Sequence, residues 1–166
     1  MNILDFGAVR GSFSGEAIQR AIDEAAAQGG GRVTVPAGEF VTASLLMRSN
    51  VELHLEAGAV LRLTDSLDAY PLIRTRRAGY EQDSHRPLLY AKGEQNVAVT
   101  GLGTLEGQGA AWWKAFRAGE LNVARPCFIC FEDCERVTLS GFKVTNSPAW
   151  TVHPLGCENV TIEGLT

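Results

Sequence analysis

The chain has 166 residues, of which 45% are hydrophobic and 20% are charged. This composition excludes a disordered protein, and the length is sufficient for one domain with a sizeable core. The net charge of −4 argues against a nucleic-acid partner, and no apolar run of about 18 residues predicts a membrane span. Residues 1–5 lack a basic and apolar leader, so we expect a cytoplasmic protein, or a secreted one whose leader was removed.

The first predicted element is an amphipathic helix that begins after Ser14 and ends at the glycines of 29–31. Its apolar residues fall at helical spacing and form one stripe: Ala17, Ile18, Ala21, Ile22 and Ala25. Nothing on this helix suggests chemistry, so we expect it to pack against the rest of the chain. It is the only convincing helix in the sequence.

After residue 31 the apolar pattern changes to period two, which predicts short strands. The segments 96–101, 136–141 and 159–164 resemble one another, and 50–55 is a looser copy. Arg136 and Asn159, which begin the last two copies, are 23 residues apart. A repeat of this length without an internal helix predicts an all-β protein with a parallel β-helix fold.

The longer gaps between the first copies leave room for further turns or for insertions, and two polar or aromatic insertions are predicted at 68–86 and 107–125. The helix before the first strand is expected to cover the N-terminal end of the stack, since a solenoid needs caps. No such cover follows Thr166. We therefore expect residues 1–166 to be the N-terminal part of a single β-helix domain that continues beyond them.

The sequence resembles a known family. Segments 5–9, 16–23 and 29–38 resemble the opening of right-handed parallel β-helix proteins, among them pectin-degrading enzymes, epimerases and phage tailspikes. Segments 86–90, 101–113 and 146–160 resemble polygalacturonases of glycoside hydrolase family 28, with Glu106 where the family has Asp. This resemblance implies inverting hydrolysis of α-1,4-galacturonosyl linkages in pectin, with a pectic oligo- or polysaccharide as partner and with no cofactor or metal.

The family's catalytic motifs, Asn-Thr-Asp, Asp-Asp, Gly-His-Gly and Arg-Ile-Lys, do not occur in this sequence. We therefore expect the catalytic residues to lie C-terminal to Thr166. Two alternatives stay open: a non-catalytic β-helix module that binds carbohydrate, and a different pectin-active β-helix enzyme such as a lyase, an epimerase or a rhamnogalacturonan hydrolase.

Strand alternation predicts which side chains could meet a substrate. Within 127–131 it places Phe128 and Cys130 on the outer face, and one repeat later it places Thr151 and His153 there. We therefore regard Thr151 and His153 as candidate substrate-binding residues, one coil before the expected catalytic coil.

Trp113 is the third candidate substrate-binding residue. It lies in the second insertion beside Trp112 and near Arg125, and aromatic rings with cations suit an anionic sugar. The alternative is that these tryptophans pack against the stack, which is also what we expect of Trp150. The basic residues of the first insertion, which include Arg77, are expected to form a solvated loop.

The remaining acidic and thiol groups suggest no chemistry. Glu132 is interpreted as a solvated turn charge. Cys127 and Cys130 are expected on opposite strand faces, which argues against a shared zinc ion. Cys134 and Cys157 share the 23-residue offset and are expected to stack as thiols on successive coils. The uncovered last coil should expose Val152, Val160 and Ile162, and this predicts end-to-end self-association of the chain.

Overall fold

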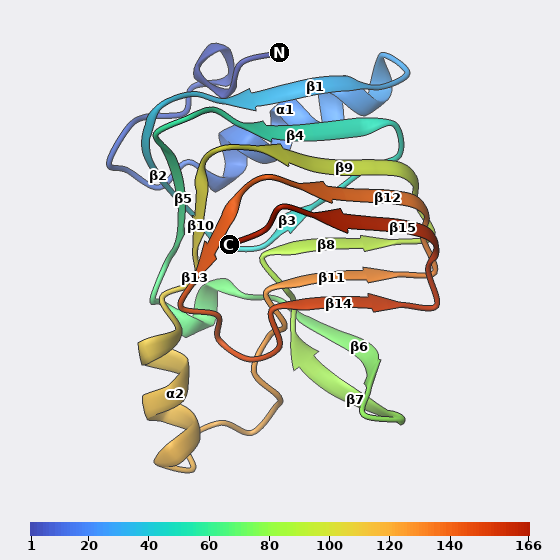
Figure 1. Ribbon diagram of the computed structural model, residues 1–166. Helices are drawn as coiled ribbons and strands as arrows, with labels where there is room; N and C mark the ends of the chain where they lie inside the picture. Colours follow the sequence, from blue (N-terminus) through green and yellow to red (C-terminus); the bar gives the residue numbers. More distant parts are fainter.

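The computed structural model describes all of residues 1–166 as a right-handed parallel β-helix, in which each coil contributes one strand to each of three sheets (Figure 1). The first sheet contains β1 (Gly31–Val35), β4 (Val51–Leu55), β9 (Gln95–Gly101), β12 (Glu135–Ser140) and β15 (Glu158–Glu163). The second contains β2 (Gly38–Thr42), β5 (Ala59–Leu63), β10 (Thr104–Glu106) and β13 (Lys143–Thr145). The third contains β3 (Leu45–Leu46), β8 (Leu89–Lys92), β11 (Ile129–Glu132) and β14 (Val152–Leu155).

The strand register confirms the predicted 23-residue repeat. Ile129 pairs with Val152, and Glu135 pairs with Glu158. Cys134 and Cys157 directly precede the second pair and so occupy equivalent positions on successive coils. The longer gaps hold insertions and no further coil, because β4 pairs directly with β9, and β9 with β12.

The core is built from columns of inward-facing side chains, one from each coil. One column runs through Val33, Leu53, Val99, Leu139 and Ile162. Its first four members are at most 1% exposed, whereas Ile162 in the last coil is 46% exposed. Alternate residues of a strand face the same side, so each coil adds one layer to every column.

Helix α1 (Gly15–Ala27) confirms the predicted amphipathic helix. Its buried face contains all five residues of the predicted stripe: Ala17, Ile18, Ala21, Ile22 and Ala25. The helix ends at Ala27 with Gln28 as its C-cap, and the three following glycines have positive φ. Ser14 holds the N-cap position, but its hydroxyl bonds to the backbone of Val9 and Ser12 and not to the helix.

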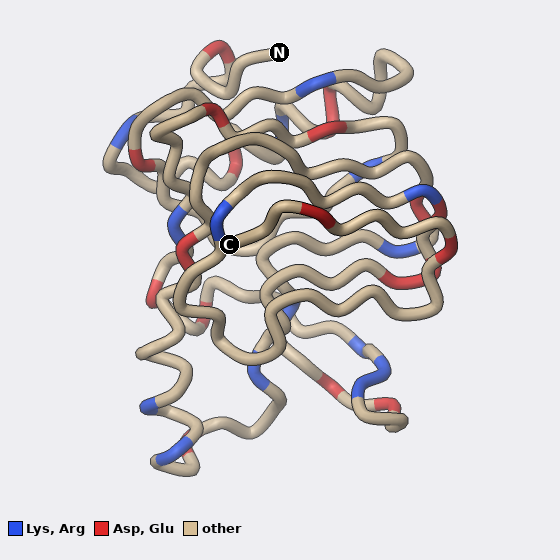
Figure 2. Tube along the Cα trace, in the orientation of Figure 1, with Lys and Arg blue, Asp and Glu red and all other residues tan.

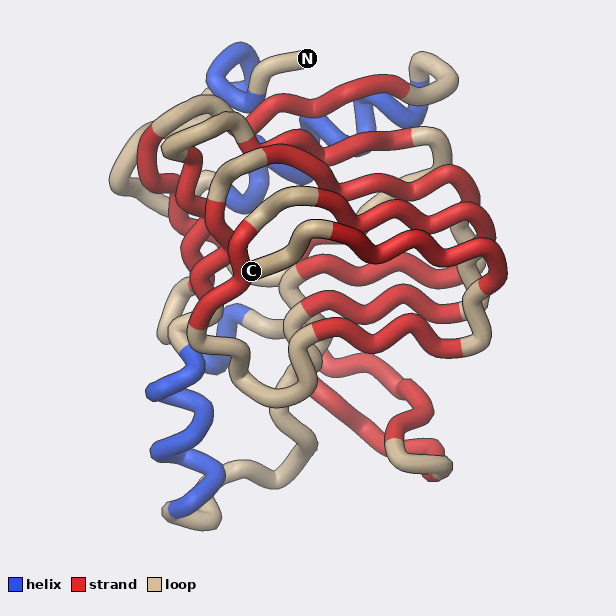
Figure 3. The backbone as a smooth tube through the Cα atoms, viewed as in Figure 1, coloured by secondary structure: helices blue, strands red, loops and turns tan.

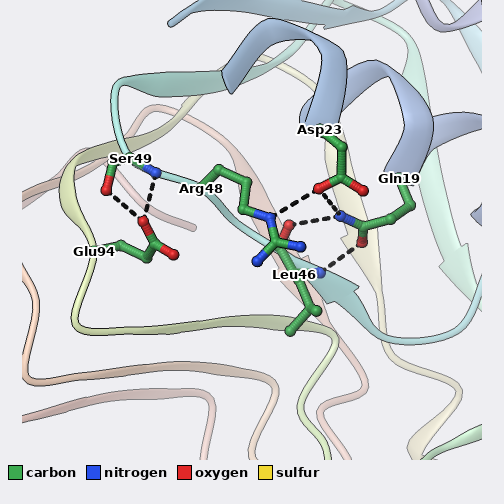
Figure 4. Close-up of polar contacts among 6 residues, drawn as sticks. All are labelled: Gln19, Asp23, Leu46, Arg48, Ser49 and Glu94. Carbon is green, nitrogen blue, oxygen red and sulfur yellow. Dashed lines mark hydrogen bonds and ion pairs between the residues drawn. The ribbon is translucent and has the colours of Figure 1, made fainter. Parts of the chain in front are cut away.

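The N-terminal segment closes the first strand edge of each of the three sheets of the stack. Residues 1 and 2, which precede the short helix η1 (Ile3–Phe6), pair with β1, and residues 11–14 bond to β2. At β3 the partner is a side chain: the Gln19 amide accepts from Leu46 N at 2.8 Å and donates to Leu46 O at 3.0 Å (Figure 4). Arg48 donates to Asp23 of the same helix at 2.8 Å. The helix cap therefore satisfies backbone groups as well as covering apolar side chains.

Both predicted insertions leave the stack at the same corner, between the second and third sheets. The first contains a short helix η2 (Leu67–Ala69) and an antiparallel hairpin of β6 (Leu72–Arg77) and β7 (Tyr80–His85). The second contains helix α2 (Gly109–Arg117), so the prediction of a single helix was wrong (Figure 3). Because successive coils stack, the two insertions touch: Ser84 bridges to Ala124, and Ala124 O accepts from His85 N at 3.1 Å.

A further stack lies at the turn into the first sheet. Asn50, Asn96, Arg136 and Asn159 all have φ between 55° and 63°. Asn96 donates to the Asn50 side chain at 2.7 Å, and Arg136 donates to that of Asn96 at 2.6 Å. No helix of the structure is long and apolar enough to cross a membrane.

Candidate functional site

The candidate site lies on the outer face of the third sheet, beside the corner from which the insertions leave. Strand pairing aligns Tyr90 with Cys130, and Cys130 with His153. The hairpin covers Tyr90 and Cys130 through Ile73, so both are buried. His153 on β14 is half-buried at the end of this row, on the outer face as predicted.

Two thiols converge on the His153 ring. Its Nδ1 atom lies 3.8 Å from Cys127 Sγ and 3.7 Å from Cys130 Sγ. The prediction of opposite faces for these cysteines was wrong, because Cys127 precedes β11 and so does not follow strand alternation. For the same reason Phe128, expected outside, is fully buried in the main core.

Burial raises the pKa of both thiols, Cys127 and Cys130, which therefore stay protonated at neutral pH. No group of three or more His, Cys, Asp or Glu side chains is arranged to hold a metal ion. The two cysteines act here as small apolar side chains beneath His153.

Trp150 is 47% exposed, so the prediction of a core position was wrong. Its ring meets that of His153 edge to face, with the centroids 5.0 Å apart. The Arg77 guanidinium carbon lies 5.6 Å from the centre of the Trp150 ring. The hairpin thus brings a cation to the start of β14, and Arg77 is part of the site rather than of a solvated loop.

A second arginine joins Arg77. The Arg77 Nη1 atom donates to the Arg125 carbonyl at 2.9 Å, and Arg125 Nη1 donates to the Pro148 carbonyl at 3.0 Å. The Arg125 guanidinium also lies over the Phe116 ring, 4.1 Å from its centre. Each insertion therefore contributes one arginine to the corner that precedes β14.

Neither Arg77 nor Arg125 is paired directly with a carboxylate, whereas Arg74 on the same hairpin pairs with Asp83 at 3.2 Å. Burial, and next the charge of Arg77, lower the pKa of Arg125 and of His153. The site therefore has a neutral imidazole at pH 7 and two cations, which favours an anionic ligand.

The interpretation of Glu132 as a solvated turn charge was wrong, because the side chain is buried. It is 3% exposed, accepts a hydrogen bond from the Thr75 hydroxyl, and lies 3.1 Å from Lys92 Nζ. A side-chain hydrogen bond from Lys92 to Glu132, and next the Glu132 charge, raise the pKa of Lys92. The carboxylate thus fastens the hairpin to the third sheet, a contact that depends on residues 57 positions apart in the chain.

The structure places the other candidates next to this corner. Thr151 is exposed, but the prediction of an outward face for it was wrong for the same reason as for Phe128. It precedes β14, and strand pairing makes it the equivalent of the buried Phe128. The Trp113 Nε1 atom donates to Ser147 O at 3.1 Å, so the ring packs on the loop that leads to Thr151. Trp112 is fully buried, as the packing alternative expected. Sequence reasoning missed Trp150 because it extended strand alternation to a residue that precedes the first residue of β14.

Comparison with known proteins identifies relatives along the whole chain. Residues 28–166 match the family model of glycosyl hydrolases family 28. A probable polygalacturonase from Vitis vinifera is 31% identical over 99% of this chain and 36% of its own length. Exopolygalacturonase A from Aspergillus niger is 29% identical over 82% of this chain and 31% of its own length.

A solved structure agrees with the sequence comparison. The hyperthermoactive exopolygalacturonase from Thermotoga maritima aligns with a TM-score of 0.88 at 32% identity, covering 99% of this chain and 46% of that one. The chain therefore spans less than half the length of each of these three relatives.

Proposed function

Because the chain belongs to glycoside hydrolase family 28, we propose that it is the N-terminal part of the β-helix domain of a polygalacturonase-type glycosidase. The proposed reaction is inverting hydrolysis of α-1,4-galacturonosyl linkages in pectin or oligogalacturonides. The family match over residues 28–166 is the observation that carries this proposal. The cytoplasmic location stays a prediction.

Residues 1–166 supply the scaffold and part of the binding surface, and we propose that the catalytic residues lie beyond Thr166. Inversion needs one carboxylic acid and one carboxylate on opposite faces of the scissile bond, about 6.5–9.5 Å apart. The only carboxylate on the strands of the third sheet is Glu132. Its burial against Thr75 and Lys92 keeps it away from any substrate on that face.

We propose that Thr151, His153 and Trp113 take part in binding the pectic chain. His153 stands on the outer face of β14, and the exposed Thr151 directly precedes this strand, in the last complete third-sheet layer of this chain. Trp113 holds the loop before them through its hydrogen bond to Ser147. A saccharide lying along the third sheet would pass from this layer to the next coil, where the catalytic carboxylates are proposed.

The test is an assay of a protein that contains these residues together with their downstream coils. Incubation with polygalacturonate should release new reducing ends, and the product should have inverted anomeric configuration. Binding without cleavage would favour the non-catalytic module. Unsaturated products would show a lyase, and either outcome would overturn the proposed hydrolysis.

We also propose that the 166-residue polypeptide associates through its last coil. Ile162 is exposed, and Val152 and Val160 are only half-buried, beside the outer edges of β14 and β15. Unpaired strand edges with apolar side chains template pairing with another chain. Light scattering should show association of this polypeptide and none of a protein extended by its downstream coils. A polypeptide that stays monomeric at high concentration would contradict the proposal.

A further inference from the structure

We propose that Arg77 and Arg125, with the exposed ring of Trp150, form a subsite that binds the carboxylate of a uronate unit. This inference rests on the proposed function, because it names the groups that would distinguish an acidic sugar from a neutral one. It assigns a binding role to both insertions, which meet only after folding.

The two arginines are held in place by backbone contacts between the insertions. Ala124 N donates to Asp83 O at 3.3 Å, and Ala124 O accepts from His85 N at 3.1 Å. Arg77 Nη1 then donates to the carbonyl of Arg125, the next residue in the second insertion. One arginine thus anchors directly on the backbone of the other, which keeps the two cations close together.

The hairpin aims Arg77 toward the third sheet. Alternate residues of a strand share one face, so Ile73, Thr75 and Arg77 point together. Ile73 packs on the cluster of Tyr90, Cys127 and Cys130, and Thr75 donates to the buried Glu132. The exposed Arg74 and Arg76 belong to the opposite face. In Figure 2 the basic residues of the hairpin lie on β6 and the acidic ones on β7.

Both guanidinium groups keep donors for a ligand. Each has five N–H groups, yet every protein contact that either donates runs through one nitrogen, Nη1. The planar fork of an arginine matches a carboxylate and binds it through two parallel hydrogen bonds. Two adjacent, half-buried cations without a carboxylate repel each other, and a bound anion would relieve that repulsion.

Trp150 completes the subsite with apolar surface. The Trp150 ring contacts the His153 ring edge to face, and the Arg77 guanidinium lies over the Trp150 ring. Even so, 47% of Trp150 remains exposed. A half-exposed tryptophan fixed between a cation and an imidazole gives a sugar ring a flat surface at low conformational cost. The subsite therefore has an apolar surface for the ring and a cationic edge for the acid.

Calorimetric titration of the chain with oligogalacturonate and with its fully methyl-esterified form tests this assignment. Arg77→Met and Arg125→Met should each weaken oligogalacturonate binding about 10-fold to 100-fold, the range for a lost charge-assisted hydrogen bond pair. Binding of the esterified form should change less than about 2-fold, since it has no carboxylate. Arg77→Lys should lose part of the affinity because it keeps the charge without the fork.

Arg74→Met is the matched control, because it removes an exposed arginine from the same strand and should leave both affinities unchanged. Trp150 emission should shift on binding in the unmodified chain. Equal binding by the unmodified chain and the Arg77 and Arg125 variants would overturn the subsite and leave the proposed function intact. Equal losses for both ligands would show a structural role only and also overturn it. Absence of any binding by the unmodified chain would count against both proposals.

Discussion

The inward column of the first sheet allows a comparison between two chemically similar truncations. Leu139 and Ile162 are paired neighbours on β12 and β15, and each loses three carbons on substitution by alanine. Leu139 is 1% exposed, so Leu139→Ala removes three buried carbons at about 0.8 kcal/mol each. The cavity that is left raises the total cost to about 3–4 kcal/mol.

Ile162→Ala should cost much less. The residue is 46% exposed, so only about half of the transfer free energy is lost, or about 1.3 kcal/mol. No closed cavity forms, because one side of the position faces solvent. We therefore expect Leu139→Ala to lower the free energy of unfolding by about 2 kcal/mol more than Ile162→Ala.

Urea unfolding followed by circular dichroism measures both changes, provided that the slope with denaturant is the same in the three proteins. Val99→Ala, one layer further inside, serves as a control that should resemble a buried truncation. Equal losses for Leu139→Ala and Ile162→Ala at a concentration where the chain is monomeric would refute the reasoning. They would mean that the last coil is covered in solution by a segment of the same chain.

Three further predictions concern catalysis, titration and backbone strain. The 166-residue chain should release no more reducing ends from polygalacturonate than a boiled sample, and release well above that control would contradict the proposed place of the catalytic pair. Burial and the Arg77 charge lower the pKa of His153 in the folded state, so the unfolded chain takes up this proton first. Stability should therefore fall as the pH drops below about 6.5, and His153→Gln should flatten this dependence in urea titrations. Arg136 has φ 56° where three other coils have Asn, and Arg136→Asn should raise the free energy of unfolding by about 0.5–1 kcal/mol, whereas Arg136→Ala should lower it.

The sequence allowed the coil register to be predicted because a repeated strand and its turn are local patterns. The offset between Arg136 and Asn159 reproduced the pairing of β12 with β15, and the helical stripe around Ile18 reproduced the buried face of α1. The predicted faces of Cys127 and Phe128, which precede β11, were wrong. Alternation holds only inside a strand, and Cys127 precedes the first residue of β11.

Features that depend on distant partners were beyond sequence reasoning. Helix α2 is short and has no side-chain cap, since Gln108 at its N-cap position has φ 48°. The burial of Glu132 depends on Thr75 in the first insertion, and the exposure of Trp150 depends on how the insertions leave the stack. These are contacts that only the folded coil order creates, and they include most of the candidate site.

The Gln19 contact with β3 also limits how copies of this chain can assemble. Since α1 and residues 1–14 close the strand edges of the stack at the N-terminal end, a second copy that extends the stack can pair only with the edges of the last coil. Both partners must then offer the same strands, which makes the contact isologous and two-fold symmetric. Such a pairing uses up the open edge of each copy, so growth stops at a dimer and a fibre cannot form. The mass from light scattering should therefore reach a plateau at twice that of the chain.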